Sequence, residues 1–508
     1  MARFVLVNRR AGLFTDAAKE ASRASVATTL GAFGSRARVV SDRDPQDPLA
    51  RRVVVFEADP GHVAQLRASL GRHAIIEPLV HRHLHRIHPA FLRGATASDA
   101  RALPGNGNRF NVSVTGAGRP LGGAEVLLYL ADAFRNITTA TVHADAQGHV
   151  SVSLPRGRRI VAVEPIPYST CWIMVANAPA NGSAVDCLTI AKAGRNGNGW
   201  WHDVMGVDTT AADRGKGINV GVIDTGCGPH PNLAHVNLIG AFINGGSEPG
   251  AAATADVAEH GTHTTGIIGA RPAEDGDYAG MAPDCSLFHA RVFKGEGEQD
   301  GPTNADLINA IDALSRDHQC DLINMSLGGG EATQAEEDAI RDASERGTLC
   351  ICSAGNESGP IDFPGAYPEC AAVSAIGLLG WAPAGSFSFG NKPQDPDKLG
   401  TDNLFLAAFS CFADGPDQAL ACCAPGVGIV STVPDKDGQR GLYMEMDGTS
   451  MASPAACGAL AVILGQDDAY QALARDITRS NTARMALTQH CRSIGLDMRF
   501  EGRGLPRF

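Results

Sequence analysis

Hydrophobic segments of two lengths alternate along residues 200–508. Short apolar runs of strand length are separated by longer stretches in which small and apolar residues recur at helical spacing. Strands are expected at 218–223, 287–292, 322–325, 349–352 and 371–376, and helices at 260–269, 304–317 and 332–345. This alternation predicts an α/β fold, with a parallel sheet covered by helices on both faces. Polar residues at strand ends then fall in the crevice where α/β proteins bind ligands.

Residues 1–80 alternate strand and helix patterns on a smaller scale. Strands are expected at 4–7, 52–57 and 74–78, and helices at 15–30 and 60–70. The second helix is amphipathic, because Val63, Leu66 and Leu70 share one face. This order fits a β-α-β-β-α-β ferredoxin-like α+β unit, which we place in residues 1–93.

Histidine alternates with other residues from His81 to His88. At strand spacing these histidines line one face of the segment. An extended, solvated tail is the interpretation we favour, and a metal-binding segment or a pH-sensitive tail are the alternatives. Residues 94–108, which follow, have the composition of a linker.

Short strands recur again between residues 109 and 192. They are expected at 110–115, 124–130, 138–143, 149–154 and 159–163, with Gly, Asp and Pro turns between them. Such regular spacing predicts a small β-sandwich. The turns within this region resemble those of carboxypeptidase-regulatory-like sandwich repeats, a resemblance that implies an accessory module. A second polar linker, 194–199, separates it from the α/β domain expected at 200–508.

Composition narrows the possible partners of the chain. Its 508 residues suggest about three domains, and 44% hydrophobic residues are typical of a globular protein. A net charge of −12 without a strong basic patch argues against nucleic acid as a partner. We recognise no transmembrane segment and no signal peptide, and therefore expect no membrane partner. The expected location is cytoplasmic, or outside the cell after export by a route without a signal peptide.

Three separate stretches carry residues suited to nucleophilic catalysis. Asp224 ends an apolar strand before a glycine turn, His260 opens a small-residue helix, and Ser450 opens another apolar helix. Taken singly, they read as a turn residue, a structural histidine and a helix cap. Together they supply a hydroxyl nucleophile, an imidazole to accept its proton and a carboxylate to orient the imidazole.

The motifs Asp-Thr-Gly, His-Gly-Thr-His and Gly-Thr-Ser-Met-Ala-Ser-Pro, in this order, resemble those of the subtilisin-like (subtilase) serine proteases. The resemblance covers residues 200–508 and implies a subtilisin-like parallel-sheet fold and a serine endopeptidase. It also implies that Asp224 orients His260, that His260 acts as general base and acid, and that Ser450 attacks the scissile carbonyl. His263, the second histidine of its motif, is taken as structural.

Two more stretches match the family. Asn356 lies in the expected oxyanion segment, where its side-chain amide would act with the Ser450 backbone N–H. The substrate-binding residues implied by the resemblance are Ser326, Leu327, Gly328 and Gly355. Nothing acidic occurs in these matched stretches, which favours a small or apolar side chain before the cleaved bond.

The sequence also departs from the family pattern. Ala455 replaces the histidine that usually follows Ser-Pro, although this position is outside the triad. No cofactor is required for the chemistry. Glu274, Asp275 and Asp277 lie in a loop where relatives often hold calcium, so a structural calcium ion is possible, and no residue is assigned as a metal ligand.

The N-terminal region resembles the inhibitory prodomain of subtilases. That resemblance implies an intramolecular inhibitor whose tail lies in the active cleft until it is cut, and a precursor that processes itself. Because a sandwich separates this region from the peptidase, processing near 88–94, near 194–199, or not at all remain alternatives.

Two other functions compete with a self-processed endopeptidase acting on protein or peptide substrates. One is a non-enzymatic binding module on a retired protease scaffold, which a broken triad would reveal. The other is a protease kept latent and directed at one partner, with the sandwich as a recognition arm.

Overall fold

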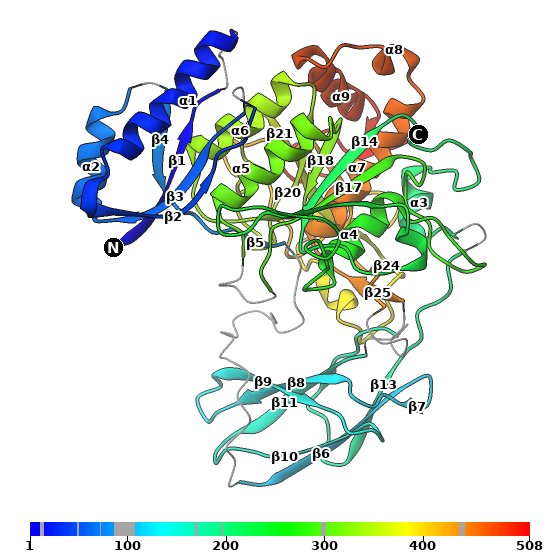
Figure 1. Cartoon of the computed structure of the whole chain (residues 1–508). Helices are drawn as coiled ribbons and strands as arrows, with labels where there is room; N and C mark the ends of the chain where they lie inside the picture. The colour runs from blue at the N-terminus through cyan, green and yellow to red at the C-terminus, as the bar shows by residue number, and fades with distance from the viewer. Residues whose placement is uncertain are drawn as a thin grey trace.

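The computed structural model describes residues 1–10, 15–47, 50–71, 73–85, 107–167, 171–194, 197–295, 301–435 and 442–508. Figure 1 shows three parts in chain order: an N-terminal unit, a β-unit and a large α/β domain. The N-terminal unit and the β-unit contact different sides of the α/β domain.

The N-terminal unit is an antiparallel sheet with two helices. Its elements are β1 (Ala2–Asn8), α1 (Asp16–Gly31), β2 (Ala37–Arg43), β3 (Val53–Ala58), α2 (Pro60–Ser69) and β4 (Ala74–Pro78). The strand order is β2-β3-β1-β4. Strand β2 was not expected, because its sequence ARVVSDR is largely exposed and lacks an apolar face.

The two faces of this small sheet have different partners. Phe4 and Leu6 of β1 pack into the core shared with α1 and α2. The alternate residues Val5 and Val7 face the α/β domain, where they pack with alanines and Ile308 of helices α5 (Asn304–Asp312) and α6 (Gln334–Glu345). The N-terminal unit therefore lies against these two helices, as Figure 1 shows.

Charged groups reinforce this contact. The fully buried Arg51 guanidinium forms ion pairs with Asp312 at 3.0 Å and with Asp342 at 3.1 Å. Burial alone would raise the pKa of Asp312, but Arg51 and neighbouring arginines hold it well below its usual value. The Glu77 carboxylate accepts hydrogen bonds from the backbone N–H groups of Gln334 and Ala335, both 2.9 Å, at the start of α6.

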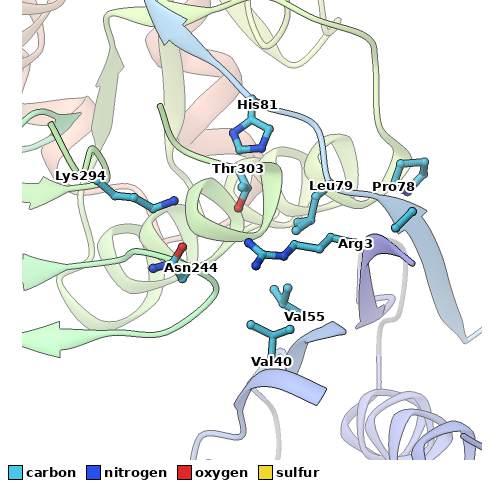
Figure 2. A pocket seen from close by; sticks show the side chains of 10 residues that line it. Arg3, Val40, Val55, Pro78, Leu79, His81, Asn244, Lys294 and Thr303 are labelled. Atoms are coloured by element: carbon cyan, nitrogen blue, oxygen red, sulfur yellow. The ribbon is translucent and has the colours of Figure 1, made fainter. Parts of the chain in front are cut away.

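Part of the junction is open. A pocket of about 290 Å³ lies between the N-terminal unit and the α/β domain. In Figure 2, Arg3 of the N-terminal unit extends toward Asn244 and Lys294, and the side chain of His81 lies beside Thr303. The two parts are thus joined along α5 and α6 but not sealed along this edge.

The β-unit consists of two facing sheets. One contains β10 (His149–Ser153), β6 (Arg109–Gly116), β13 (Ser183–Cys187) and β7 (Arg119–Pro120), and the other contains β12 (Ala176–Asn177), β11 (Arg159–Ile166), β8 (Glu125–Ala131) and β9 (Ile137–His143). Their inner faces share one apolar core that includes Val112, Val126 and Leu128. Strand β13 pairs in parallel with β6, so the unit is not wholly antiparallel.

The outer face of the second sheet packs on the α/β domain. Leu127 and Tyr129, which alternate with the inward residues of β8, belong to the same core as Trp172 and Trp201. Backbone hydrogen bonds add to this contact, since the N–H of Val175 donates to Gly385 and the N–H of Phe387 donates to Ile173. The β-unit is therefore continuous with the main core on one side.

The α/β domain is built on a nine-stranded, mostly parallel sheet. Its strand order is β16 (Glu248–Pro249), β15 (Asn237–Ala241), β17 (Ser286–Arg291), β14 (Asn219–Asp224), β18 (Leu322–Met325), β20 (Leu349–Ser353), β21 (Cys370–Leu378) and β22 (Leu404–Leu406), and β23 (Cys422–Pro425) also pairs with β21. Only the β16–β15 and β21–β22 pairs are antiparallel among these described strands. The five strands expected from sequence are confirmed.

Helices cover both faces of this sheet, as predicted. In β14, Val220 and Val222 pack toward α4 (His260–Gly269) and α7 (Thr449–Gly465), whereas Ile223 packs toward α5 and α6. The remaining elements are helices α3 (Trp200–Met205), α8 (Asp468–Gln471), α9 (Ile477–Gln489) and α10 (Met498–Glu501), hairpin β24 (Ile429–Thr432) with β25 (Tyr443–Met446), and β26 (Cys491–Arg492) with β27 (Leu505–Pro506).

Two properties concern the surroundings of the chain. None of the described helices is both long and apolar enough to cross a membrane. All thirteen cysteines are free thiols, and burial raises the pKa of Cys285, for example, to about 12.

Glu164 of β11 gives a test of the contact between the β-unit and the α/β domain. Burial raises the pKa of Glu164 to about 8, although Tyr129 donates a hydrogen bond of 2.7 Å to it. Between pH 4.5 and 8 the unfolded chain releases this proton and the folded chain keeps it, so stability falls as pH rises through this window. Glu164→Gln should remove that dependence and stabilise the fold at pH 7 by about 3 kcal/mol.

Thermal unfolding from pH 5 to 9, with a serine-protease inhibitor present, measures this effect. The control Glu248→Gln removes a charge at an exposed position of β16. Equal pH profiles for Glu164→Gln and the unsubstituted protein would contradict the assignment.

Candidate active site

Asp224 and His260 meet where strand β14 ends and helix α4 begins. His260 Nδ1 lies 2.7 Å from Asp224 Oδ1, and both side chains are fully buried. Asp224 also accepts hydrogen bonds from the Thr225 backbone N–H (2.7 Å) and from Thr264 Oγ1 (3.0 Å). The carboxylate is thus held from three sides, and its bond to Nδ1 directs Nε2 of the ring away from Asp224.

Close backbone approach makes this meeting possible. A Cβ added to Gly261 would lie 2.1 Å from the Gly226 carbonyl oxygen, and Gly226 itself has φ +116°. Side chains at these positions would therefore separate α4 from the turn after β14. This explains the glycines in the Asp-Thr-Gly and His-Gly-Thr-His motifs.

A buried carboxylate fixes the same turn. Asp256 accepts hydrogen bonds from Thr225 Oγ1 at 2.7 Å and from the Thr262 backbone N–H at 2.8 Å. Thr225 Oγ1 in turn accepts a hydrogen bond from the Gly261 N–H at 2.8 Å. Burial raises the pKa of Asp256, while these hydrogen bonds oppose the rise.

His263 connects α4 to the hairpin β24–β25. Its Nε2 lies 3.1 Å from the Ile429 carbonyl oxygen and 2.9 Å from that of Met444. The contact is with backbone and lies one helical turn from His260. This geometry agrees with the structural role that the sequence suggested.

Ser450 is the second residue of α7. Its Oγ donates to the Ser326 carbonyl oxygen at 3.0 Å, and its backbone N–H donates to the His85 carbonyl oxygen at 3.2 Å. His260 Nε2 is buried and has no hydrogen-bond partner within the described ranges. The structure therefore pairs His260 with Asp224 and leaves the Ser450 hydroxyl bonded elsewhere.

Asn356, just after β20, is held by the residue before Ser450. Its Oδ1 accepts hydrogen bonds from Thr449 N (3.0 Å) and Thr449 Oγ1 (2.9 Å). Its Nδ2 is buried and has no partner among the described residues. An amide fixed through its oxygen in this way presents its N–H groups to whatever enters the site.

The histidine-rich segment of the same chain occupies the cleft. Strand β5 (His83–Leu84) pairs antiparallel with β19 (Leu327–Gly328), so Leu84 lies opposite Leu327. Upstream, Arg82 N–H donates to Pro302 and Asn304 N–H donates to Val80, both at 2.9 Å. The segment is extended as expected, but Arg82 and His85 are buried, so the expectation of a solvated tail was wrong for them. Residues 86–88 lie outside the described ranges.

The expected substrate residues contact this segment. The Ser326 carbonyl oxygen lies 3.5 Å from the His85 nitrogen, and Ser326 Oγ donates to the Ser450 carbonyl at 2.8 Å. A Cβ on Gly328 would lie 2.4 Å from the His85 ring. A Cβ on Gly355 would lie 2.8 Å from Asp362 Oδ2, so this glycine leaves room for that carboxylate.

The His85 ring lies in a polar pocket. Its Nδ1 lies 2.6 Å from Ser353 Oγ and its Nε2 lies 3.2 Å from Asp362 Oδ2. The second contact is within ion-pair range, although its orientation is not that of a regular hydrogen bond. Sequence comparison favoured a small or apolar side chain here because Asp362 lies outside the matched stretches.

A second carboxylate lies at the rim. Glu357 Oε1 is 3.6 Å from His83 Nε2. Burial would raise the pKa of Glu357, but its hydrogen bond with His83 and the charge of His85 outweigh that effect and lower it to about 2. The cleft therefore presents negative charge around the histidines of the tail.

Possible metal ligands are found in the tail rather than in the expected loop. Asp277 accepts hydrogen bonds from Asn232 and from the backbone N–H groups of Ala273 and Glu274, so it caps its own loop. Among the described residues, His83, His85 and Asp362 form the one group whose three ligand atoms lie within 4.8 Å of one another. Calcium binding at the loop stays a prediction.

A twisted parallel sheet, with a buried aspartate, histidine and serine at the ends of β14, α4 and α7, is characteristic of subtilisin-like serine peptidases. Residues 215–493 match the model of the Subtilase family. The chain therefore belongs to the subtilase family of serine peptidases, enzymes that hydrolyse peptide or protein substrates.

Relatives support the assignment. The chain is 32% identical over 268 residues to the major intracellular serine protease of Bacillus subtilis, covering 50% of this chain and 70% of the relative. It is 31% identical over 301 residues to the intracellular serine protease of Paenibacillus polymyxa, covering 58% and 79%.

Among solved structures, it is similar to fervidolysin from Fervidobacterium pennivorans, a keratinolytic enzyme related to subtilisin. The TM-score is 0.59 at 18% identity, over all of this chain and 60% of the fervidolysin chain, and this likeness shows the fold.

Gly261→Ala tests the close approach of α4 to β14. The added Cβ would meet a backbone oxygen that cannot rotate away, so α4 should shift and separate His260 from Asp224. We expect the rate of peptide hydrolysis to fall about 100-fold, since small displacements of reacting groups have effects of that size. Active-site labelling with a fluorophosphonate should fall in parallel.

Gly390→Ala, at a position with no atom within 4 Å of the new Cβ, is the matched control. Retention of the full rate by Gly261→Ala would mean that the turn can give way, and that this approach does not fix the site.

Proposed function

We propose that the chain is the precursor of a serine endopeptidase in which Asp224, His260 and Ser450 form the catalytic triad. The observation that supports this most directly is the 2.7 Å contact of His260 with the fully buried Asp224. In this arrangement Asp224 keeps the proton of the neutral ring on Nδ1, so Nε2 can accept the proton of a nucleophile. The unpartnered Nε2 is consistent with that role.

The Ser450 hydroxyl needs one local change to act. Its Oγ now donates to the Ser326 carbonyl oxygen, and a rotation about χ1 to another staggered rotamer would redirect it. Catalytic hydrogen bonds commonly tighten only when a substrate is correctly seated. We therefore propose that the hydroxyl turns toward His260 Nε2 when the carbonyl to be attacked is in place.

Two donors would stabilise the oxyanion. The Ser450 backbone N–H already bonds the His85 carbonyl oxygen, and the buried Asn356 Nδ2 has no other partner within the described part of the chain. As Ser450 Oγ bonds to the carbonyl carbon, negative charge forms on that oxygen and both donors interact more strongly with it. Loss of one such donor typically lowers turnover by about 100- to 1,000-fold.

The reaction then follows from these positions. His260 takes the Ser450 proton as the C–O bond forms, and returns it to the amide nitrogen as the C–N bond breaks. Water, deprotonated by His260, attacks the acyl-enzyme, and the products are a carboxylate and a free amine. None of these side chains is replaced, so a retired protease scaffold is the weaker interpretation.

The N-terminal unit acts as an intramolecular inhibitor in this proposal. Its tail adds a strand beside β19, and the His85 carbonyl lies on the Ser450 N–H where a scissile carbonyl is expected. The bond to be cut is then His85–Arg86, just before the first processing region considered from sequence. The buried Arg51 pairs and the Glu77 cap would hold the cleaved unit in place.

Ser450→Ala should abolish both labelling and processing. The unsubstituted chain is expected to react with a fluorophosphonate and to yield fragments 1–85 and 86–508, which intact-mass spectrometry identifies. The variant should stay full length and unlabelled. Ser453→Ala controls for loss of a neighbouring hydroxyl on α7. A full-length, unlabelled wild-type chain would contradict the proposed activity, and a different new N-terminus would contradict the proposed processing site.

Arg51→Ala should weaken inhibition by the cleaved N-terminal unit. It leaves the buried carboxylates of Asp312 and Asp342 without their shared partner, a change that usually costs about 3–5 kcal/mol. We expect at least about a 100-fold rise in the inhibition constant of fragment 1–85, measured against the processed enzyme. Arg38→Ala, on the exposed side of the sheet, is the control and should leave inhibition unchanged.

A further inference from the structure

The tail provides a template of how the cleft receives a peptide. With the His85 carbonyl on the Ser450 N–H, His85 is the first residue upstream of the bond to be cut and Arg82 is the fourth. Backbone pairing with β19 holds residues 83 and 84 between them. The side chains of Arg82 and His85 are both fully buried, so these two positions have enclosed pockets.

The fourth position is an arginine pocket. Arg82 Nε lies 3.3 Å from Glu336 Oε1, and Nη2 donates to Glu336 Oε2, a two-point contact with a carboxylate that is itself fully buried. The remaining guanidinium donors reach backbone oxygens, with Nη1 on Gly329 and Nη2 also on Glu331 at 3.1 Å. The guanidinium thus has partners on three sides.

Glu336 is positioned in advance by its neighbours. Tyr367 OH donates to Glu336 Oε2 at 2.9 Å and accepts a hydrogen bond from the Thr333 N–H at 2.8 Å. Burial lowers the pKa of Arg82, but the Glu336 charge outweighs this and raises it. A flat guanidinium can use both carboxylate oxygens and the two carbonyls, whereas a lysine offers a single point charge.

The first position is a histidine pocket. The ring of His85 lies with Nδ1 against Ser353 Oγ at 2.6 Å and Nε2 against Asp362 at 3.2 Å, and Gly328 leaves space for the ring. An imidazole can satisfy both groups at once. A phenyl ring of similar size would leave the hydroxyl and the carboxylate without that partner.

Other ionisable groups near the ring add negative charge or are neutral. Glu357 lies at the rim and pairs with His83, whose ring is 5.6 Å from that of His85. Burial raises the pKa of the Cys411 thiol, beside Glu357, to about 12, so it carries no charge at neutral pH. The pocket is therefore anionic on the side that faces the imidazole.

We propose that the enzyme selects peptides with arginine at the fourth and histidine at the first position upstream of the cleaved bond. Glu336 and Asp362 are the two specificity-determining carboxylates. This selectivity rests on the proposed function, and it makes the tail both the first substrate and, once cut, a product that fits the cleft. The hydrolysed bond is the amide after histidine, and water supplies the new carboxylate oxygen and the proton balance.

Competition between peptides in one reaction tests the proposal with the processed enzyme. The reference peptide is His-Arg-His-Leu-His-Arg-Ile-His, the sequence of residues 81–88. Its rivals carry alanine or lysine for arginine at the second residue, or alanine or phenylalanine for histidine at the fifth. Mass spectrometry of the products gives ratios of kcat/KM that do not depend on how much enzyme is active or inhibited. EDTA is present throughout because His83, His85 and Asp362 could share a metal ion.

We expect arginine to exceed alanine by at least about 30-fold, with lysine between them, because truncating one member of a buried charge pair is costly. Histidine should exceed alanine and phenylalanine by about 10-fold. In Glu336→Gln the arginine preference should shrink to a few-fold, while the histidine preference stays. Asp362→Asn should do the reverse.

Glu337→Gln is the matched control, since this neighbouring carboxylate pairs with Arg341 and should change neither ratio. If a pocket variant fails to fold, the peptide ratios of the unsubstituted enzyme still decide the question.

Fluorophosphonate labelling of the same samples separates the two levels of the proposal. Enzyme that labels but cuts all peptides equally would overturn the selectivity and leave the proposed function intact. Enzyme that neither labels nor cuts would overturn the proposed function itself. Equal arginine preference in Glu336→Gln and the unsubstituted enzyme would remove Glu336 from the assignment.

Discussion

The close approach of helix α4 to the turn after β14 is the constraint on which the site depends. Asp224 and His260 come from separate elements and reach 2.7 Å only because Gly226 and Gly261 bring two backbones together. The parallel sheet fixes one element, and the apolar contacts of α4 and α7 fix the other. Burial of the pair removes water that would otherwise compete for the carboxylate. The chemistry of the domain is therefore set by backbone packing before any substrate enters.

Local patterns were sufficient to predict the α/β domain. Its strands are apolar runs buried on both faces, and Asp224, His260 and Ser450 occur in compact motifs that resemble those of a known family. Strand β2 was missed because neither of its faces carries a hydrophobic pattern. The polar tail was taken as solvated for a similar reason: its burial comes from a cleft formed by residues far away in the sequence, such as Glu336, 254 positions from Arg82.

The same limit explains what was missed in the cleft. Asp362 is ten residues or fewer from the oxyanion segment, yet nothing local distinguishes it from a surface aspartate. Glu336 lies in the first turn of an amphipathic helix, where an acidic residue is ordinary. Their importance depends on what lies opposite, and only the folded chain brings Arg82 and His85 to them.

The β-unit differs from the N-terminal unit in how it is attached. Its outer sheet contributes Leu127 and Tyr129 to the same continuous core as Trp172 and Trp201, whereas the N-terminal unit has a core of its own and meets the domain across one face. A cut after residue 85 would sever the first unit and leave the second covalently joined. Maturation would then discard the lid and retain the pedestal, so the working enzyme would carry its β-unit as a permanent part of its outline.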